Sequence, residues 1–143
     1  MARYKASLES SRAPDAAFAY LSDFSSTQEW DPNVAEAERI GDGPIGDGTE
    51  FRLFTSFAGR KSSITYRVVE FDPPHAVTFR GENAVVTSLD RITFEAIDGG
   101  ARIVYDADLR LKGVLRIGGP LLQLALNRLG RQALDGLRET LEA

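Results

Sequence analysis

The most regular pattern in the chain is a run of apolar residues at helical spacing between Pro120 and Glu142. Pro120 suits the first position of a helix, because the N–H that it lacks needs no partner there. The apolar positions form one stripe and charged residues fill the opposite side. The stripe comprises Leu122, Ala125, Leu126, Leu129, Ala133, Leu137 and Leu141, and the opposite side carries Arg128, Arg131, Asp135, Arg138, Glu139 and Glu142. The pattern predicts one amphipathic helix of about 23 residues, roughly 34 Å long.

Small residues make this stripe uneven. Ala125, Ala133 and Gly136 stand where larger side chains would fill space. A long helix must cover a wide apolar surface, and seven strands spaced about 4.8 Å apart would provide one. We therefore predict a helix that covers a sheet and leaves room beneath itself.

Before this helix, apolar and polar residues mostly alternate, which is typical of half-buried strands. Alternation and turn signals predict seven strands, at residues 3–9, 34–40, 49–57, 61–71, 75–82, 85–96 and 101–111. Two short helices separate the first two strands, one opening at Pro14-Asp15 and the other running from Thr27 to Trp30. Short turns join the later strands, so they should pair antiparallel. The predicted class is α+β: a helix-grip fold, in which a curved antiparallel sheet wraps around the long C-terminal helix, with residues 1–143 as one domain.

Several turn and core motifs within this order resemble a known family. They are Trp30-Asp31-Pro32, Gly46-Asp47-Gly48-Thr49, the Val-Glu-Phe-Asp-Pro-Pro sequence at residues 69–74 that ends a predicted strand, and the hairpin at residues 99–105. Together they are similar to the START-related polyketide cyclase/dehydrase superfamily, also called SRPBCC. The resemblance implies a deep apolar cavity between the sheet and the C-terminal helix. It also implies a range of roles, since the superfamily includes lipid carriers, plant-allergen-like ligand binders, aromatic polyketide cyclases and accessory proteins of hydroxylases and dehydrogenases.

The composition of the chain excludes several classes of site and favours a cytoplasmic location. The chain has 143 residues, 43% of them hydrophobic, and a formal net charge of −4. The pI is about 5.0, which argues against a nucleic-acid surface. There is no cysteine, so a disulfide, a thiol nucleophile and a thiolate metal site are excluded. The N-terminus alternates, and the longest apolar stretch, at residues 114–126, is too broken to span a bilayer, so we expect no transmembrane segment and a cytoplasmic location.

The obvious candidates for acid–base or metal chemistry have simpler explanations. His75 is the only histidine and follows two prolines, so we expect a surface turn residue, no metal site and no cofactor. The Gly-Asp-Gly triplets at residues 41–43 and 46–48 lack phosphate-loop and calcium-loop spacing, and are read as turns. Asp106 and Asp108 share a strand face with Arg102 and Arg110. A solvated ion-pair ladder is therefore favoured over an acid–base pair.

Four polar residues fall on predicted inward faces: Tyr66, Ser88, Asp90 and Tyr105. Buried polar groups need partners, so these either bond each other or face a wet cavity. A buried Asp90 would also need pairing, for which Arg80 and Arg52 are candidate partners.

The leading functional hypothesis is the binding or carrying of a hydrophobic small molecule or lipid between sheet and helix. The predicted ligand-binding residues are Trp30, Phe51, Leu53, Tyr66, Phe79, Asp90, Ile92, Tyr105, Leu122, Leu126 and Leu129. One alternative is a cyclase or dehydratase acting on an aromatic polyketide-like substrate. Another is a non-enzymatic accessory module that docks through Leu121, Leu124 and the neighbouring residues 114–117. A weak homodimer is left open.

Overall fold

The computed structural model describes residues 2–57, 60–112 and 119–142. The strands are β1 (Ala2–Ser10), β2 (Val34–Ile40), β3 (Glu50–Phe57), β4 (Arg60–Asp72), β5 (Ala76–Glu82), β6 (Val86–Ile97) and β7 (Gly100–Leu111). The helices are α1 (Pro14–Ser22), a 3₁₀ turn η1 (Phe24–Ser26), α2 (Thr27–Trp30) and α3 (Gly119–Glu142). Each predicted strand agrees with the observed one to within a residue at either end.

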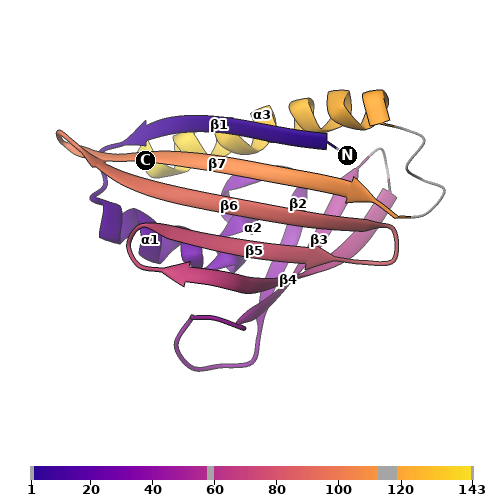
Figure 1. The fold of residues 1–143 in the computed structure, drawn as a ribbon, viewed down its shortest axis with the longest axis horizontal. Coiled ribbons are helices and arrows are strands. Elements are labelled where there is room, and N and C mark those ends of the chain that lie inside the picture. Colours follow the sequence, from indigo (N-terminus) through magenta and orange to yellow (C-terminus); the bar gives the residue numbers. More distant parts are fainter. Residues whose placement is uncertain (1, 58–59, 113–118, 143) are drawn as a thin grey trace.

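The seven strands form one antiparallel sheet in the order β1-β7-β6-β5-β4-β3-β2 (Figure 1). Consecutive strands from β2 to β7 are neighbours, as short turns require. The helices α1, η1 and α2 carry the chain from β1 to the opposite edge of the sheet at β2. The long helix α3 then returns to lie along β1 (Figure 1). The predicted α+β helix-grip class is confirmed.

The N-terminal half of α3 is fastened to the edge strand β1 by one amide side chain. The Arg3 backbone N–H donates to Gln123 Oε1 at 2.9 Å, and Gln123 Nε2 donates to the Arg3 carbonyl oxygen at 2.7 Å. These two bonds satisfy backbone groups that an edge strand would otherwise leave free. They also fix the distance between this part of α3 and the sheet.

Two glycines let α3 approach its neighbours closely. A Cβ at Gly130 would lie 2.4 Å from the Tyr4 ring, and a Cβ at Gly136 would lie 1.9 Å from the Trp30 carbonyl oxygen. Gly136 was predicted to leave open space beneath the helix, and this is wrong, because the Trp30 backbone fills that space. Ala125 and Ala133 border the cavity between the helix and the sheet, whereas Gly136 borders the open groove between α2 and α3.

The buried face of α3 changes along its length. Leu134, Leu137 and Leu141 are buried, whereas Leu122 and Leu129 in the first half are only half-buried. Leu134 lies outside the predicted stripe. It is buried because the C-terminal half of α3 packs against α2 as well as β1, which widens the apolar face beyond a single stripe.

An aromatic cluster fills the sheet face beneath α1 and η1. Phe24 stacks on Phe79 with ring centroids 4.0 Å apart and meets Phe51 and Tyr66 edge-on. Phe24 belongs to η1, a turn that the sequence pattern did not predict. The sheet face is therefore solid under α1 and η1, and any hollow must lie under α3.

Candidate functional site

A cavity of about 370 Å³ lies between the sheet and the N-terminal two-thirds of α3. Its walls are mostly aliphatic, because the inward positions of β6 and β7 meet the half-buried leucines of the helix. The residues that line it include Tyr4, Trp30, Asp31, Val34, Ile64, Tyr66, Ser88, Asp90, Tyr105, Ala107, Leu109, Leu122, Ala125, Leu126, Leu129 and Ala133. Such a volume and lining are typical of a small-molecule site.

One polar cluster interrupts this apolar wall. The Ser88 hydroxyl donates to Asp90 Oδ1 at 2.6 Å, and the Tyr105 hydroxyl donates to Asp90 Oδ2 at 2.5 Å. Strand alternation places Ser88 and Asp90 on the same face of β6, and the neighbouring strand β7 supplies Tyr105. Of the four polar residues predicted to face inward, Ser88, Asp90 and Tyr105 bond each other, and all four, with Tyr66, line the cavity.

Asp90 was predicted to pair with Arg80 or Arg52, and this is wrong. Arg80 Nη2 lies 3.1 Å from Glu82 Oε2, and Arg52 Nη1 lies 3.4 Å from Glu38 Oε1. Phe79 is fully buried on the inner face of β5, so the next residue, Arg80, must point outward. The same alternation along β3 turns Arg52 away from the cavity, and hydroxyl groups replace arginine as the partners of Asp90.

Burial shifts the titration of these groups. Burial raises the pKa of Asp90, although the hydrogen bonds from Ser88 and Tyr105 oppose the shift. Burial also raises the pKa of Tyr66 and Tyr105 well above the usual range, with the nearby Asp90 carboxylate as the next contribution. The two phenols therefore stay neutral near pH 7, and they can hydrogen-bond without adding charge to the cavity.

Tyr66 owes its position to a glycine on the next strand. Gly81 pairs directly with Tyr66 across β4 and β5, and a Cβ there would lie 2.4 Å from the Tyr66 ring. The ring thus packs close to the backbone of β5 at Gly81. Tyr66 also lines the cavity, and its ring forms a T-shaped pair with Phe24 at a centroid distance of 5.0 Å.

Trp30 closes one end of the cavity. It is buried, its Nε1 donates to Ser26 Oγ at 3.2 Å, and its ring meets Tyr105 edge-on with centroids 6.2 Å apart. The next residue, Asp31, accepts hydrogen bonds on Oδ1 from the Asn33 backbone at 2.9 Å and from Asn33 Nδ2 at 3.5 Å. Burial raises the pKa of Asp31 as well. Residues 30–34 thus form a wall of the cavity.

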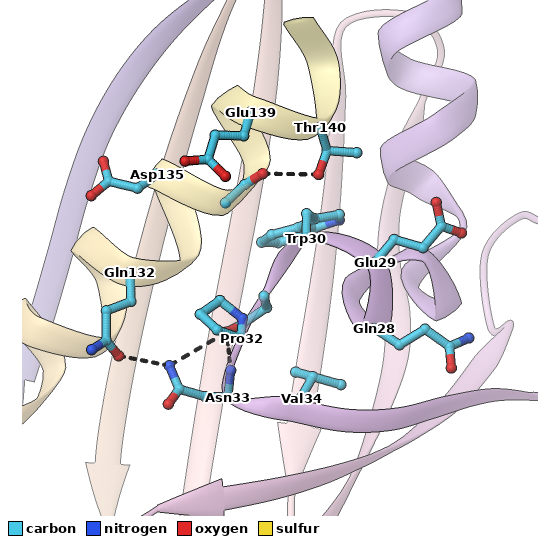
Figure 2. Close-up of a pocket in the computed structure, with 12 residues that line it drawn as sticks. Gln28, Glu29, Trp30, Pro32, Asn33, Val34, Gln132, Asp135, Glu139 and Thr140 are labelled. Carbon is cyan, nitrogen blue, oxygen red and sulfur yellow. Dashed lines mark hydrogen bonds between the residues drawn. The ribbon is translucent and has the colours of Figure 1, made fainter. Parts of the chain in front are cut away.

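The outer side of this wall borders a larger, open groove of about 750 Å³ between α2 and α3. Figure 2 shows Asn33 reaching toward α3, where Asn33 Nδ2 donates to Gln132 Oε1 at 3.1 Å. Carboxylates and amides dominate the groove, including Gln28, Glu29, Asp135 and Glu139 (Figure 2). It offers little apolar surface to bury, so the smaller, more apolar cavity beneath α3 is the better ligand site.

The structure brings together seven of the eleven predicted ligand-binding residues at the cavity: Trp30, Tyr66, Asp90, Tyr105, Leu122, Leu126 and Leu129. The other four, Phe51, Leu53, Phe79 and Ile92, do not line it; they are at most 3% exposed and belong to the solid core. For the two phenylalanines the reason is Phe24, which covers them from η1.

Sequence reasoning missed several cavity residues. Tyr4, Ile64, Ala107 and Leu109 all stand on faces that alternation marks as inward, so that signal could have found them. Asp31 had no such signal, because it lies in the irregular connection between α2 and β2.

The remaining sequence candidates lie away from the cavity. His75 is exposed in the turn before β5, as predicted. Ion pairs form on the predicted face, with Arg110 Nε 3.4 Å from Asp108 Oδ1 as expected. Asp106 pairs instead with Arg3, whose Nη2 lies 2.7 Å from Asp106 Oδ2, and Arg102 pairs with Glu9 and Glu95. Within residues 2–57, 60–112 and 119–142, no three His, Cys, Asp or Glu side chains gather closely enough to hold a metal ion.

The surface proposed for docking is described only in part. Leu121 and Leu124 are 73% and 67% exposed on α3, whereas residues 114–117 lie outside the described part of the chain. Their docking role therefore stays a prediction. Among the helices that the structure describes, none has the length and hydropathy needed to cross a membrane.

Comparisons with known proteins agree with this geometry. The chain belongs to the family described as polyketide cyclase / dehydrase and lipid transport, whose sequence model matches residues 1–142. The resemblance to the START-related superfamily is thereby confirmed. A comparison with curated proteins found no match.

Similar solved structures share the fold along almost the whole chain. A START superfamily protein from Mycobacterium smegmatis is 12% identical with a TM-score of 0.81, covering 97% of this chain and 96% of its own. The Zhui aromatase/cyclase from Streptomyces is 16% identical with a TM-score of 0.78, covering 96% and 92%. A Thermus thermophilus protein is 18% identical with a TM-score of 0.80, covering 96% and 94%. At these identities the likeness concerns the fold alone.

Proposed function

We propose that this protein binds or carries a hydrophobic small molecule or lipid in the cavity between the sheet and α3. The observation that carries the proposal is the cavity itself: about 370 Å³, mainly aliphatic, with one polar cluster on its wall. Pockets of this kind hold a ligand by burying its apolar surface and orient it through a few polar groups. The family description, which includes lipid transport, supports the same function.

A cyclase or dehydratase is the second candidate. Asp90 and Tyr105 form a short hydrogen-bonded pair at the cavity wall, and burial raises the pKa of Asp90 above its ordinary value, the direction that a general acid needs. The name of the Streptomyces aromatase/cyclase with this fold favours the same reaction. An enolate that develops during cyclisation needs positive or hydrogen-bond-donating groups beside it. Among the described residues that line the cavity there is no Arg, Lys or His, so binding without turnover takes first place.

Fluorescence titration with Nile red, a neutral apolar dye, tests the proposal. Trp30 is the only tryptophan and lines the cavity, so a dye bound there should quench its emission by energy transfer. Ala125 lies on the helix side of the cavity, and Ala125→Phe should fill the space and weaken dye binding at least tenfold. Leu124→Phe is the matched control, because the same ring is then placed on the exposed side of α3.

The fold of each variant is checked by circular dichroism and thermal melting. If Ala125→Phe unfolds the protein, Ala133→Leu provides a smaller filling change at another cavity position. Binding that is lost in the filled variants and kept in Leu124→Phe supports the proposal. Absence of binding to the unmodified protein, or equal binding by all folded variants, overturns it.

A further inference from the structure

Among the residues that the structure describes, the ionisable groups that line the cavity and can carry charge near pH 7 are acidic. Asp31 and Asp90 both line it, and no Arg, Lys or His does so among the described residues. The open groove on the other side of residues 30–34 repeats the pattern, with Glu29, Asp135 and Glu139 on its walls and no basic residue from the described part of the chain. A ligand in the cavity therefore lies near two carboxyl groups and near no basic side chain of the described residues, and a low-dielectric surrounding strengthens the effect of any charge there.

The hydrogen bonds of the polar cluster decide which of its atoms can still bond a ligand. The Ser88 and Tyr105 oxygens lie 2.6 Å and 2.5 Å from Asp90, and in both contacts the hydroxyl is the donor and the carboxyl oxygen is the acceptor. Both hydroxyl hydrogens are thus used on Asp90. A carboxylate can accept about four hydrogen bonds, so Asp90 keeps acceptor capacity, and Tyr105 can still accept through its oxygen.

The acceptor capacity and negative charge of the Asp90 cluster favour a complementary ligand group beside it. A ligand alcohol, phenol or amine can donate a hydrogen bond to Asp90 or to the Tyr105 oxygen. A ligand carboxylate or phosphate brings only acceptors and a like charge, and must give up its hydration on entering the apolar cavity. Arg80 and Arg52, which could have neutralised such an anion, pair instead with Glu82 and Glu38 on the outer face of the sheet.

We infer that the cavity selects apolar molecules whose polar end donates hydrogen bonds and carries no negative charge, and that it rejects fatty acids and other apolar anions. Asp90 is the specificity-determining group in this selection, and Asp31, which also lines the cavity, adds to it. The inference rests on the proposed function and adds the chemical class of the ligand.

Three probes with a common naphthalene body test the selection: 2-naphthalenemethanol, 2-naphthylmethylamine and 2-naphthoate. Their dissociation constants are measured at pH 7 by displacement of Nile red. The alcohol and the amine should displace the dye, and the carboxylate should bind at least tenfold more weakly than the alcohol, a difference of about 1.4 kcal/mol. The charge-neutralising change Asp90→Asn should reduce this ratio to less than about threefold.

Asp106→Asn is the matched control. It removes the same charge from β7 on the outer face, where Asp106 pairs with Arg3, so the selectivity of the cavity should not change. If Asp90→Asn does not fold, Asp31→Asn takes its place with the same expected direction.

The outcomes separate this inference from the proposed function. A carboxylate that binds within about threefold of the alcohol, or selectivity that survives in a folded Asp90→Asn protein, overturns the inference while the carrier function stands. If neither Nile red nor any probe binds, the proposed function fails and the inference fails with it.

Discussion

The boundary between solid core and open cavity along α3 can be measured by one substitution made at two positions. Leu137 is fully buried in the core cluster, whereas Leu129 is half-buried and borders the cavity. Truncation of each residue to alanine removes the same three carbon atoms from the same helix. Only the surroundings differ, so the difference in stability reports whether the leucine faces packed side chains or empty space.

The expected losses follow from these surroundings. Three buried carbons at about 0.8 kcal/mol each are worth roughly 2.4 kcal/mol. At Leu137 a new cavity adds to this, so the unfolding free energy should fall by about 3–5 kcal/mol. At Leu129 the space beside the side chain already exists and the side chain is partly exposed, so the loss should be about 1–2 kcal/mol.

Urea unfolding followed by far-ultraviolet circular dichroism measures both losses. If the slope of the unfolding free energy against urea concentration is the same in each variant, the substitutions change stability and not the compactness of the unfolded state. Arg131→Ala, on the exposed side of α3, is the control and should stay within about 0.5 kcal/mol of the unmodified protein. Equal losses at Leu129 and Leu137 would refute the reasoning, since they would mean that no cavity lies beneath the first half of the helix.

Three further predictions concern single contacts. Gly81→Val should displace the Tyr66 ring, because even a Cβ there lies 2.4 Å from it, and should lower both the melting temperature and the affinity for Nile red; unchanged values would contradict this. Gly136→Ala should lower the melting temperature, although alanine favours helices by about 1 kcal/mol, because its Cβ would meet the Trp30 carbonyl oxygen; a gain in stability would be the opposite result. Burial raises the pKa of Asp90 in the folded protein above its ordinary value of about 3.9, so the folded state holds the proton more tightly, and stability should fall as pH rises from about 4 through that raised pKa. The unfolding free energy of the unmodified protein relative to Asp90→Asn, followed by urea titration, should therefore decrease over this range, and a difference that does not vary with pH would contradict it.

Local pattern in the sequence was enough to predict the sheet and the long helix. Alternation has a period of two residues and a helix has a period of 3.6, so strands and helix separate without knowledge of their neighbours. The same alternation correctly placed Asp90 and Tyr105 on inward faces beside the aliphatic residues of their strands. It also correctly turned Asp106 and Asp108 outward, where they form ion pairs.

The extent of the cavity was decided only by tertiary structure. An inward-facing residue lines a cavity or a solid core according to what lies opposite, and alternation is silent on that. Phe24, from a turn without periodic pattern, covers Phe51 and Phe79 and removes them from the predicted wall. Asp31 enters the cavity from an irregular connection for which no spacing rule exists.

The hydrogen-bond partners of buried polar groups were likewise decided by the packing of strands against each other. Asp90 is bonded by a hydroxyl on its own strand and by another on β7, and strand register, which depends on the whole sheet, set the second. The packing partner of Gly136 was also decided by tertiary structure: its missing side chain makes room for the Trp30 backbone and not for a ligand. Sequence periodicity determines which face of an element is buried, because it arises within that element; the packing partner on that face, and the space left over, depend on elements distant in the chain.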